Sequence, residues 1–169
     1  MNLSQAIVKM YPDAVPMENF VVRDDSDGRG AYIDYWGLPY PQPTNQELQD
    51  NWILCCKNEK KNELDAKCQE TILAGFTATN GYSYSFDIYD QANFTGKLAQ
   101  VGADPTITTV NTKTKDVGVI QVTRDEYIQI CNDASNHKES NLAKLWSLEA
   151  QVDALPADAT EDQINAIQW

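Results

Sequence analysis

The segment of residues 30–48 constrains the fold of this chain more than any other. It starts with aromatic and β-branched side chains that favour a strand, namely Tyr32, Ile33, Tyr35 and Trp36. Prolines at alternate positions over residues 39–43 then exclude a helix and a central strand, and favour an extended run. Thr44 and Glu47 have the spacing of a capping box, so a helix begins there.

The helix that begins at Thr44 is expected to be long. Its apolar stripe starts at Leu48 and resumes over residues 64–72, and Gly75 ends the helix. Between these parts, residues 57–63 are polar on every face, a pattern typical of helices that bridge modules through solvent. We therefore expect three parts: a module of residues 1–56, a polar helical connector of residues 57–63, and a module of residues 64–169.

Both modules are predicted to mix helices and short antiparallel strands, so the fold class is α+β. The first should hold a short helix capped by Ser4 and a β-hairpin made by strands over residues 20–22 and 31–35. In the second, hairpins and helices alternate. A hairpin around Asn80-Gly81 is followed by a helix over 88–101, capped by Asp87, with Ile88, Phe94, Leu98 and Val101 facing inward. Strands over 106–111 and 117–122 then flank a turn of residues 112–116, and they are followed by a helix from Thr123 to about Leu155 and a last helix capped by Thr160.

Charge and hydropathy exclude several classes of partner. The net charge is −12, from 25 acidic and 13 basic residues, and no segment forms a basic stripe. Binding to nucleic acid is therefore not expected, and an anionic membrane surface would repel the chain. The longest apolar run, residues 52–56, is far too short to span a bilayer. The first residues lack the charged and apolar regions of a signal peptide, so we expect a cytoplasmic protein.

No group of residues has the spacing of a catalytic, cofactor or metal site. The four cysteines, at 55, 56, 68 and 131, form no CxxC pair, and His137 is the one histidine that could join them. A calcium loop with Gly28 at its sixth position would begin with Arg23, a cation where the strongest ligand belongs. Phosphate loops and nucleophile elbows are absent. We therefore expect no enzyme, cofactor or metal, and reduced cysteines.

Aromatic and proline residues are the remaining candidates for function, as a partner-binding surface. Tyr and Trp are favoured anchors at interfaces, and the proline run should hold Tyr40 extended and exposed. Core packing is the competing interpretation for Trp36 and Trp52, and Trp169 could either pack back on the long helix or anchor a partner. The predicted partner-binding residues are Tyr35, Trp36, Tyr40, Pro41 and Trp169.

Short motifs in order along the chain resemble known phage proteins. The first part is similar to the XkdW-like small prophage tail proteins through residues 11–15, 24–30, 32–33, 36–38 and 43–48. Residues 64–155 resemble an uncharacterised domain common at the C-termini of phage tail proteins, through residues 74–76, 80–81, 90–93 and the helix at Thr123. Residues 160–169 are similar to the end of many tail-fibre assembly proteins.

This resemblance implies a phage tail accessory protein without catalytic residues. The expected role is a tail-fibre assembly chaperone that binds the C-terminal region of a fibre, which is expected to be trimeric, in the host cytoplasm. One alternative is a permanent adaptor of the fibre or baseplate in the virion tail. Another is a module whose aromatic face binds a host-surface glycan. The sequence leaves the oligomeric state open.

Overall fold

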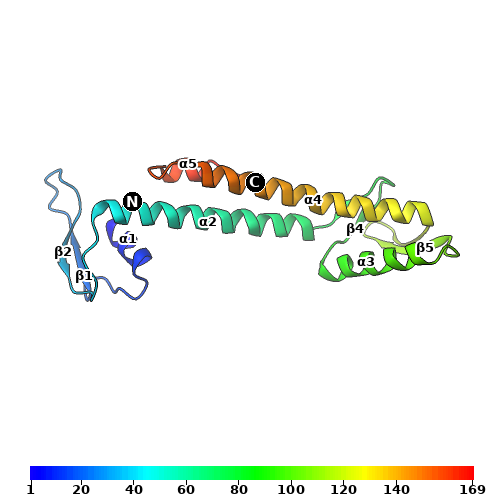
Figure 1. Cartoon of the computed structure of the whole chain (residues 1–169), viewed down its shortest axis with the longest axis horizontal. Coiled ribbons are helices and arrows are strands. Elements are labelled where there is room, and N and C mark those ends of the chain that lie inside the picture. Colours follow the sequence, from blue (N-terminus) through cyan, green and yellow to red (C-terminus); the bar gives the residue numbers. More distant parts are fainter. The chain divides into compact units, whose positions relative to one another are not determined.

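The computed structural model describes residues 1–169 and confirms an α+β fold with an early hairpin and a long helix (Figure 1). Three separate pairs of antiparallel strands alternate with five helices. In chain order the elements are α1 (Leu3–Met10), β1 (Phe20–Arg23), β2 (Tyr32–Trp36), α2 (Asn45–Leu73), β3 (Phe76–Thr77), β4 (Ser83–Tyr84), α3 (Ile88–Ala103), β5 (Thr109–Thr114), β6 (Gly118–Thr123), α4 (Arg124–Ala154) and α5 (Glu161–Asn165).

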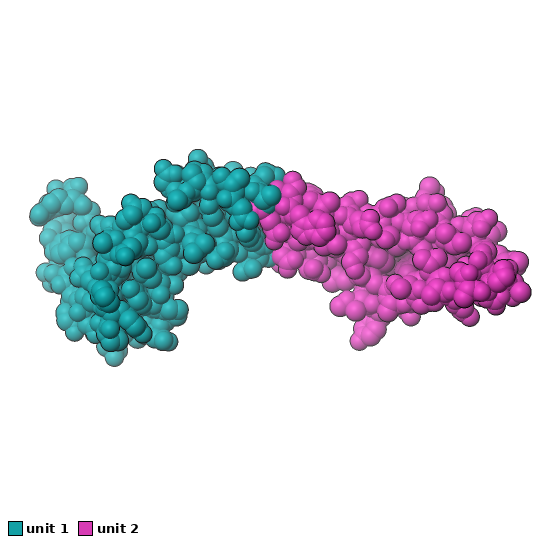
Figure 2. Space-filling model, in the orientation of Figure 1, with its two compact units in different colours: residues 1–62, 150–168 teal, residues 63–149, 169 magenta.

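The chain forms two compact units, coloured separately in Figure 2. Unit 1 consists of residues 1–62 and 150–168, and unit 2 of residues 63–149 with Trp169. Helices α2 and α4 each contribute residues to both units. The compact units thus group residues 150–168 with the first part of the chain, whereas the predicted modules placed them in the second; the module boundaries themselves stay a prediction.

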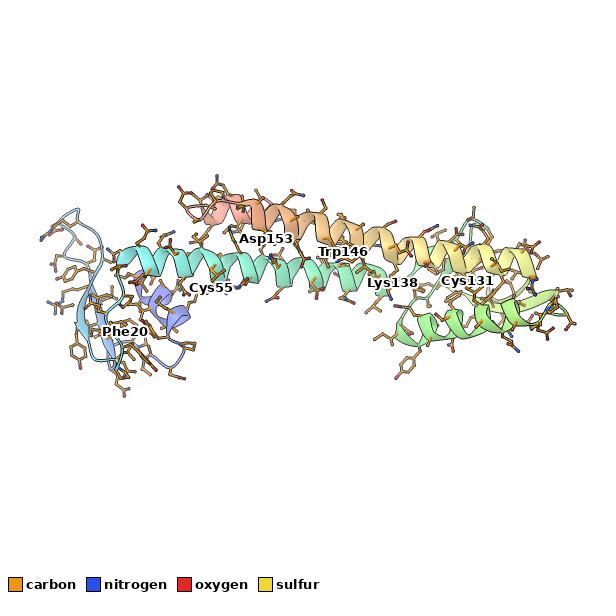
Figure 3. The ribbon with its side chains drawn as sticks, in the orientation of Figure 1. Phe20, Cys55, Cys131, Lys138, Trp146 and Asp153 are labelled. Atoms are coloured by element: carbon orange, nitrogen blue, oxygen red, sulfur yellow. The ribbon has the colours of Figure 1, made fainter.

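The core of unit 1 explains why residues 150–168 belong there. Helices α1 and α2 and strand β1 bury apolar side chains against one another, including Phe20 (Figure 3). Ile164 of α5 lies in the same core with 1% of its surface exposed. The indole Nε1 of Trp52 also donates to Glu161 Oε1 over 2.7 Å. Apolar burial and this hydrogen bond therefore fix α5 to unit 1.

The segment 57–63 is helical, but it does not run through solvent as expected. Lys60 is only 4% exposed. Lys57 Nζ donates to the carbonyl of Leu155 over 2.5 Å, and Lys61 forms an ion pair with Asp153. Long lysine side chains can bury their aliphatic stems while their ammonium groups reach a polar partner, which is why a polar sequence here still packs.

A β-bulge determines which side chains of β2 face the core of unit 1. Val21 pairs with Tyr35 and Val22 pairs with Ile33, so Asp34 is an extra residue without a partner on β1. Ile33 and Trp36 consequently both pack against the core, although strict alternation would place them on opposite faces. Tyr32 and Tyr35 are left exposed.

Unit 2 is organised around an aromatic cluster. The rings of Phe76 and Phe86 contact each other, and each contacts Phe94 and His137, with centroids 5.3 to 6.2 Å apart. The buried Tyr84 contacts Phe76 and Phe94. The capping boxes expected at Thr123 with Glu126 and at Thr160 are present, and Asp87 caps α3 as expected, through a capping box with Asp90. None of the helices combines the length and apolar character needed to cross a membrane.

Three local expectations were wrong. Asn2, not Ser4, caps α1, since its side chain accepts from the amide of Gln5. Ile88 is 72% exposed, because as the first residue of α3 it points back beyond the packed part of that helix. Strands β5 and β6 start later than predicted, and residues 112–114 lie in β5 rather than in the turn. The turn is shorter than expected because the Thr114 hydroxyl donates to the carbonyl of Gly118, which adopts a φ of 84°.

Gly75 ends α2 in a conformation that only glycine fits. Its φ is +97°, and an added Cβ would lie 2.2 Å from the carbonyl oxygen of Tyr84. We expect Gly75→Ala to lower the free energy of unfolding of unit 2 by about 2 to 4 kcal/mol. Urea unfolding followed by circular dichroism checks this. Gly96→Ala is the matched control, because no heavy atom lies within 4 Å and alanine favours the helix; equal stability of the two variants would contradict the prediction.

Candidate partner-binding surface

The proline run after β2 is held at both of its ends. The indole Nε1 of Trp36 donates to the carbonyl oxygen of Tyr40 over 2.7 Å. At the far end Pro43 is buried, and the backbone amide of Thr44 donates to the Glu47 carboxylate over 2.7 Å. The segment between Trp36 and Thr44 is therefore fixed, with Pro39 and Pro41 exposed, but it bends at residues 38–40 rather than running extended as expected, because the Trp36 N–H holds the carbonyl of Tyr40.

Tyr40 lies on top of a small aromatic cluster. Its ring stacks on Tyr11 with centroids 5.4 Å apart and an angle of 15° between the planes. Tyr11 in turn contacts Trp36 edge to face at 5.5 Å, and Trp36 lies 6.5 Å from Phe20 in the core. Tyr40 is 55% exposed, while Trp36 is half-buried. We call Tyr11, Trp36, Tyr40 and Pro41 the aromatic surface.

Tyr35 and Tyr32 are exposed on the hairpin itself. Tyr35 is 53% exposed, and its ring covers Gly37 so closely that an added Cβ there would lie 2.4 Å from the tyrosine oxygen. The Tyr32 hydroxyl donates to Asp25 over 2.9 Å, and this hydrogen bond raises the pKa of the tyrosine. Tyr35 and Trp36 are neighbours on β2 beyond the bulge, so ordinary alternation makes Tyr35 face away from the core side on which Trp36 lies.

The structure brings together some of the predicted partner-binding residues. Trp36, Tyr40 and Pro41 belong to one fixed run, and Tyr40 is exposed as expected. The half-buried Trp36 holds Tyr40 in place through its hydrogen bond rather than presenting its own ring to solvent. Tyr35 lies outside this group. Trp169 belongs to unit 2, where the ammonium of Lys144 lies 4.5 Å from its ring centroid. Whether any of them binds a partner stays a prediction.

Sequence reasoning missed two residues of unit 1. Tyr11 appeared only within the motif of residues 11–15, although its ring stacks under that of Tyr40. Met17 is strongly exposed and has a φ of 68°, an uncommon conformation for a side chain of this size. No local motif marks either feature. The Tyr11 stack depends on a contact between distant segments, and the exposure of Met17 depends on a loop conformation.

The chemistry available on this surface is apolar contact and stacking. The Trp36 N–H is already bonded to the carbonyl of Tyr40, which leaves the exposed Tyr40 ring as the main contact for a partner. Thiol chemistry is also disfavoured elsewhere in the chain. Burial raises the pKa of the Cys56 and Cys68 thiols, and that of Cys131 to about 11, so these groups are largely protonated and weakly nucleophilic at neutral pH.

Stacking between Tyr11 and Tyr40 should stabilise the run measurably. A double-mutant cycle of Tyr11→Ala and Tyr40→Ala, followed by urea unfolding, is expected to give a coupling energy of about 0.5 to 1.5 kcal/mol. The control cycle combines Tyr40→Ala with Tyr35→Ala, for which we expect a coupling near zero. A Tyr11–Tyr40 coupling as small as that of the control would show that the stack contributes nothing.

Comparisons with known proteins match the two parts of the chain separately. Residues 3–53 match the family model described as XkdW protein. The chain is 40% identical over 52 residues to the uncharacterized protein YqcD of Bacillus subtilis (strain 168), covering 31% of this chain and 47% of that protein. It is 38% identical over 73 residues to the phage-like element PBSX protein XkdW of the same organism, covering 41% of this chain and 65% of that protein.

The chain therefore spans less than two thirds of the length of these two relatives. No solved structure matches it significantly. The remaining part, residues 55–168, matches a family model described as a domain of unknown function, DUF4376, and this description gives no link to tail fibres. The match extends over more than half of the chain. The chain belongs to the DUF4376 family, and an XkdW-like segment precedes the family's domain.

Proposed function

We propose that this chain is a phage tail accessory protein that assists the assembly of tail fibres by binding a fibre's C-terminal region. Two observations support the proposal. The XkdW relative carries the name of a phage-like element protein, which supports an association with phage. The aromatic surface, the observation on which the binding role depends, lies within the segment that matches the XkdW model.

The aromatic surface has properties that suit binding to another protein. Tyr40 presents more than half of its surface to solvent, next to the exposed Pro41. Its position is set in advance by the Trp36 hydrogen bond and by the Tyr11 stack, so binding would cost little conformational entropy. Exposed tyrosines on such supports are frequent hot spots of interfaces.

A chaperone role explains why a partner would need this surface. Fibre regions rich in β-structure assemble slowly, and meanwhile they expose apolar side chains and unpaired strand edges that aggregate. A chain that covers such a region with an apolar contact and carries a net charge of −12 would keep the complex soluble. Binding would take place in the host cytoplasm, before the fibre joins the virion.

Co-expression with the phage's own tail-fibre protein tests the proposal. Without this chain we expect the fibre to be insoluble, and with it we expect soluble fibre that co-purifies with the full chain. Tyr40→Ala should weaken binding about 30-fold, the equivalent of a 2 kcal/mol hot spot. Tyr89→Ala is the matched control, because Tyr89 is an 81% exposed tyrosine of unit 2.

Three outcomes would contradict this role. Soluble fibre trimers made without the chain would exclude a chaperone. The chain found in purified virions at the stoichiometry of the fibre would indicate a permanent adaptor instead. Glycan binding by the isolated chain that Tyr40→Ala abolishes would indicate a host-recognition module. Tyr40→Ala loses the Tyr11 stack and is expected to unfold at a slightly lower urea concentration than Tyr89→Ala; native circular dichroism of both variants under the binding conditions shows that the comparison concerns binding rather than folding.

A further inference from the structure

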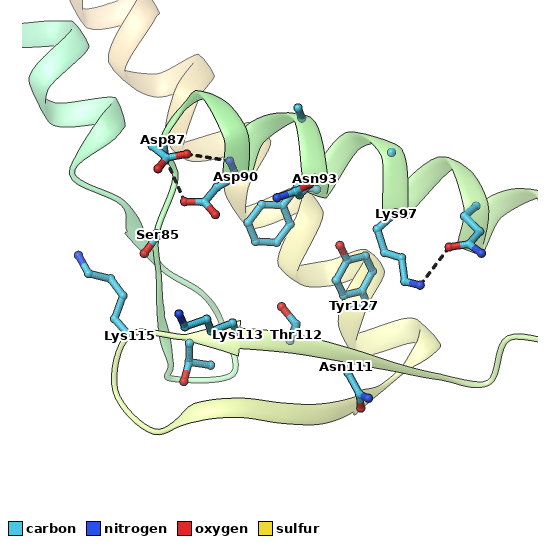
Figure 4. A pocket seen from close by; sticks show the side chains of 15 residues that line it. Ser85, Asp87, Asp90, Asn93, Lys97, Asn111, Thr112, Lys113, Lys115 and Tyr127 are labelled. Carbon is cyan, nitrogen blue, oxygen red and sulfur yellow. Dashed lines mark hydrogen bonds between the residues drawn. The ribbon is translucent and has the colours of Figure 1, made fainter.

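A groove of about 980 Å³ lies in unit 2 between α3 and β5 (Figure 4). Helix α3 contributes Asn93 and Lys97 to one wall, and the other wall is formed by β5. The rings of Phe94 and Tyr127 stack at a centroid distance of 6.2 Å and give the groove an apolar floor. Both walls and the floor therefore belong to one compact unit.

The wall on the β5 side is the edge of a strand. Residues 111–115 line the groove without interruption. Successive side chains of a strand point to opposite faces, so the four consecutive residues 111–114 of β5 can border one space only along the backbone edge. This edge carries backbone N–H and C=O groups that point away from the partner strand.

The edge of β5 is not paired within the chain. β5 forms a ladder with β6 alone, and no other strand extends this sheet. The nearest backbone hydrogen bonds to other segments are just beyond its two ends, from Lys115 to Ser83 and from Arg124 to Thr108. An exposed strand edge of this kind is a template for an added strand.

Lysines outnumber carboxylates in the groove by three to two, although the chain as a whole is strongly acidic. Lys97, Lys113 and Lys115 line the groove together with Asp87 and Asp90. The two carboxylates already accept backbone hydrogen bonds in the capping box of α3. Lys97 donates to Gln100 and Lys115 to the carbonyl of Ala74, whereas the ammonium of Lys113 makes no hydrogen bond or ion pair. An acidic ligand fits this charge.

We propose that the groove binds an extended acidic segment of a partner protein, which adds to β5 as a further strand. Backbone groups of the segment pair with the edge of residues 109–114, and its carboxylates contact Lys113 and Lys97. Its apolar side chains, on alternate positions, face Phe94 and Tyr127. This proposal goes beyond the chaperone role, because the groove lies in unit 2 and does not include the aromatic surface.

A synthetic peptide of three Glu-Val repeats with blocked ends is the probe. In NMR titrations of the ¹⁵N-labelled full chain, we expect a Kd of about 0.1 to 1 mM, as for a short segment, and shifts of the amides of residues 109–114. Lys113→Glu should weaken binding at least about tenfold, because it places like charges together. Lys67→Glu, at an exposed position of α2, is the control of equal charge change.

Further peptides separate strand addition from other modes of binding. A version with N-methylated backbone amides should not bind, because it cannot pair with β5; binding as tight as that of the parent would overturn the proposal. Equal binding of a Lys-Val peptide would overturn the acidic preference. Absence of binding together with self-association of the chain through residues 109–114 would show that a second copy covers the edge. Tyr40→Ala should bind the peptide normally, so failure of the groove and failure of the aromatic surface are distinguishable.

Discussion

The extra residue in β2 determines what unit 1 buries and what it presents. Because Asp34 has no partner on β1, Ile33 and Trp36 both reach the core, and Tyr35 remains outside. Burial of the Trp36 ring brings its N–H to the carbonyl of Tyr40, which fixes the start of the proline run. A hairpin without the bulge would turn Trp36 away from the core and leave Tyr40 unsupported.

Local signals in the sequence predicted the helix starts well. The capping pairs at Thr44, Asp87, Thr123 and Thr160 involve residues three positions apart, so their hydrogen bonds need no distant contact. For the same reason the turn at Asn80-Gly81 was predicted between the right strands. Exposure of Tyr40 also followed from local chemistry, because the prolines around it prevent it from entering a helix or a ladder.

Contacts between distant segments could not be predicted in this way. The bulge at Asp34 depends on pairing with β1. The place of α5 depends on Ile164 entering a core made mostly by α1 and α2. The burial of Lys60 accompanies contacts of its neighbours Lys57 and Lys61 with residues 153–155. The Tyr11–Tyr40 stack joins residues on either side of the hairpin. In the groove of unit 2, the sequence showed strands and lysines but not which edge stays unpaired.

Hydrogen exchange measured on the full chain, alone and bound to the fibre's C-terminal region, tests the central claim most directly. Leu38, Tyr40 and Gln42 carry the backbone amides of the proline run that lie outside the β1–β2 ladder, and exposed amides of this kind exchange fast unless a partner covers them. We expect binding to slow their exchange at least about tenfold. Unchanged exchange in this segment, with protection confined to other parts of the chain, would contradict the account.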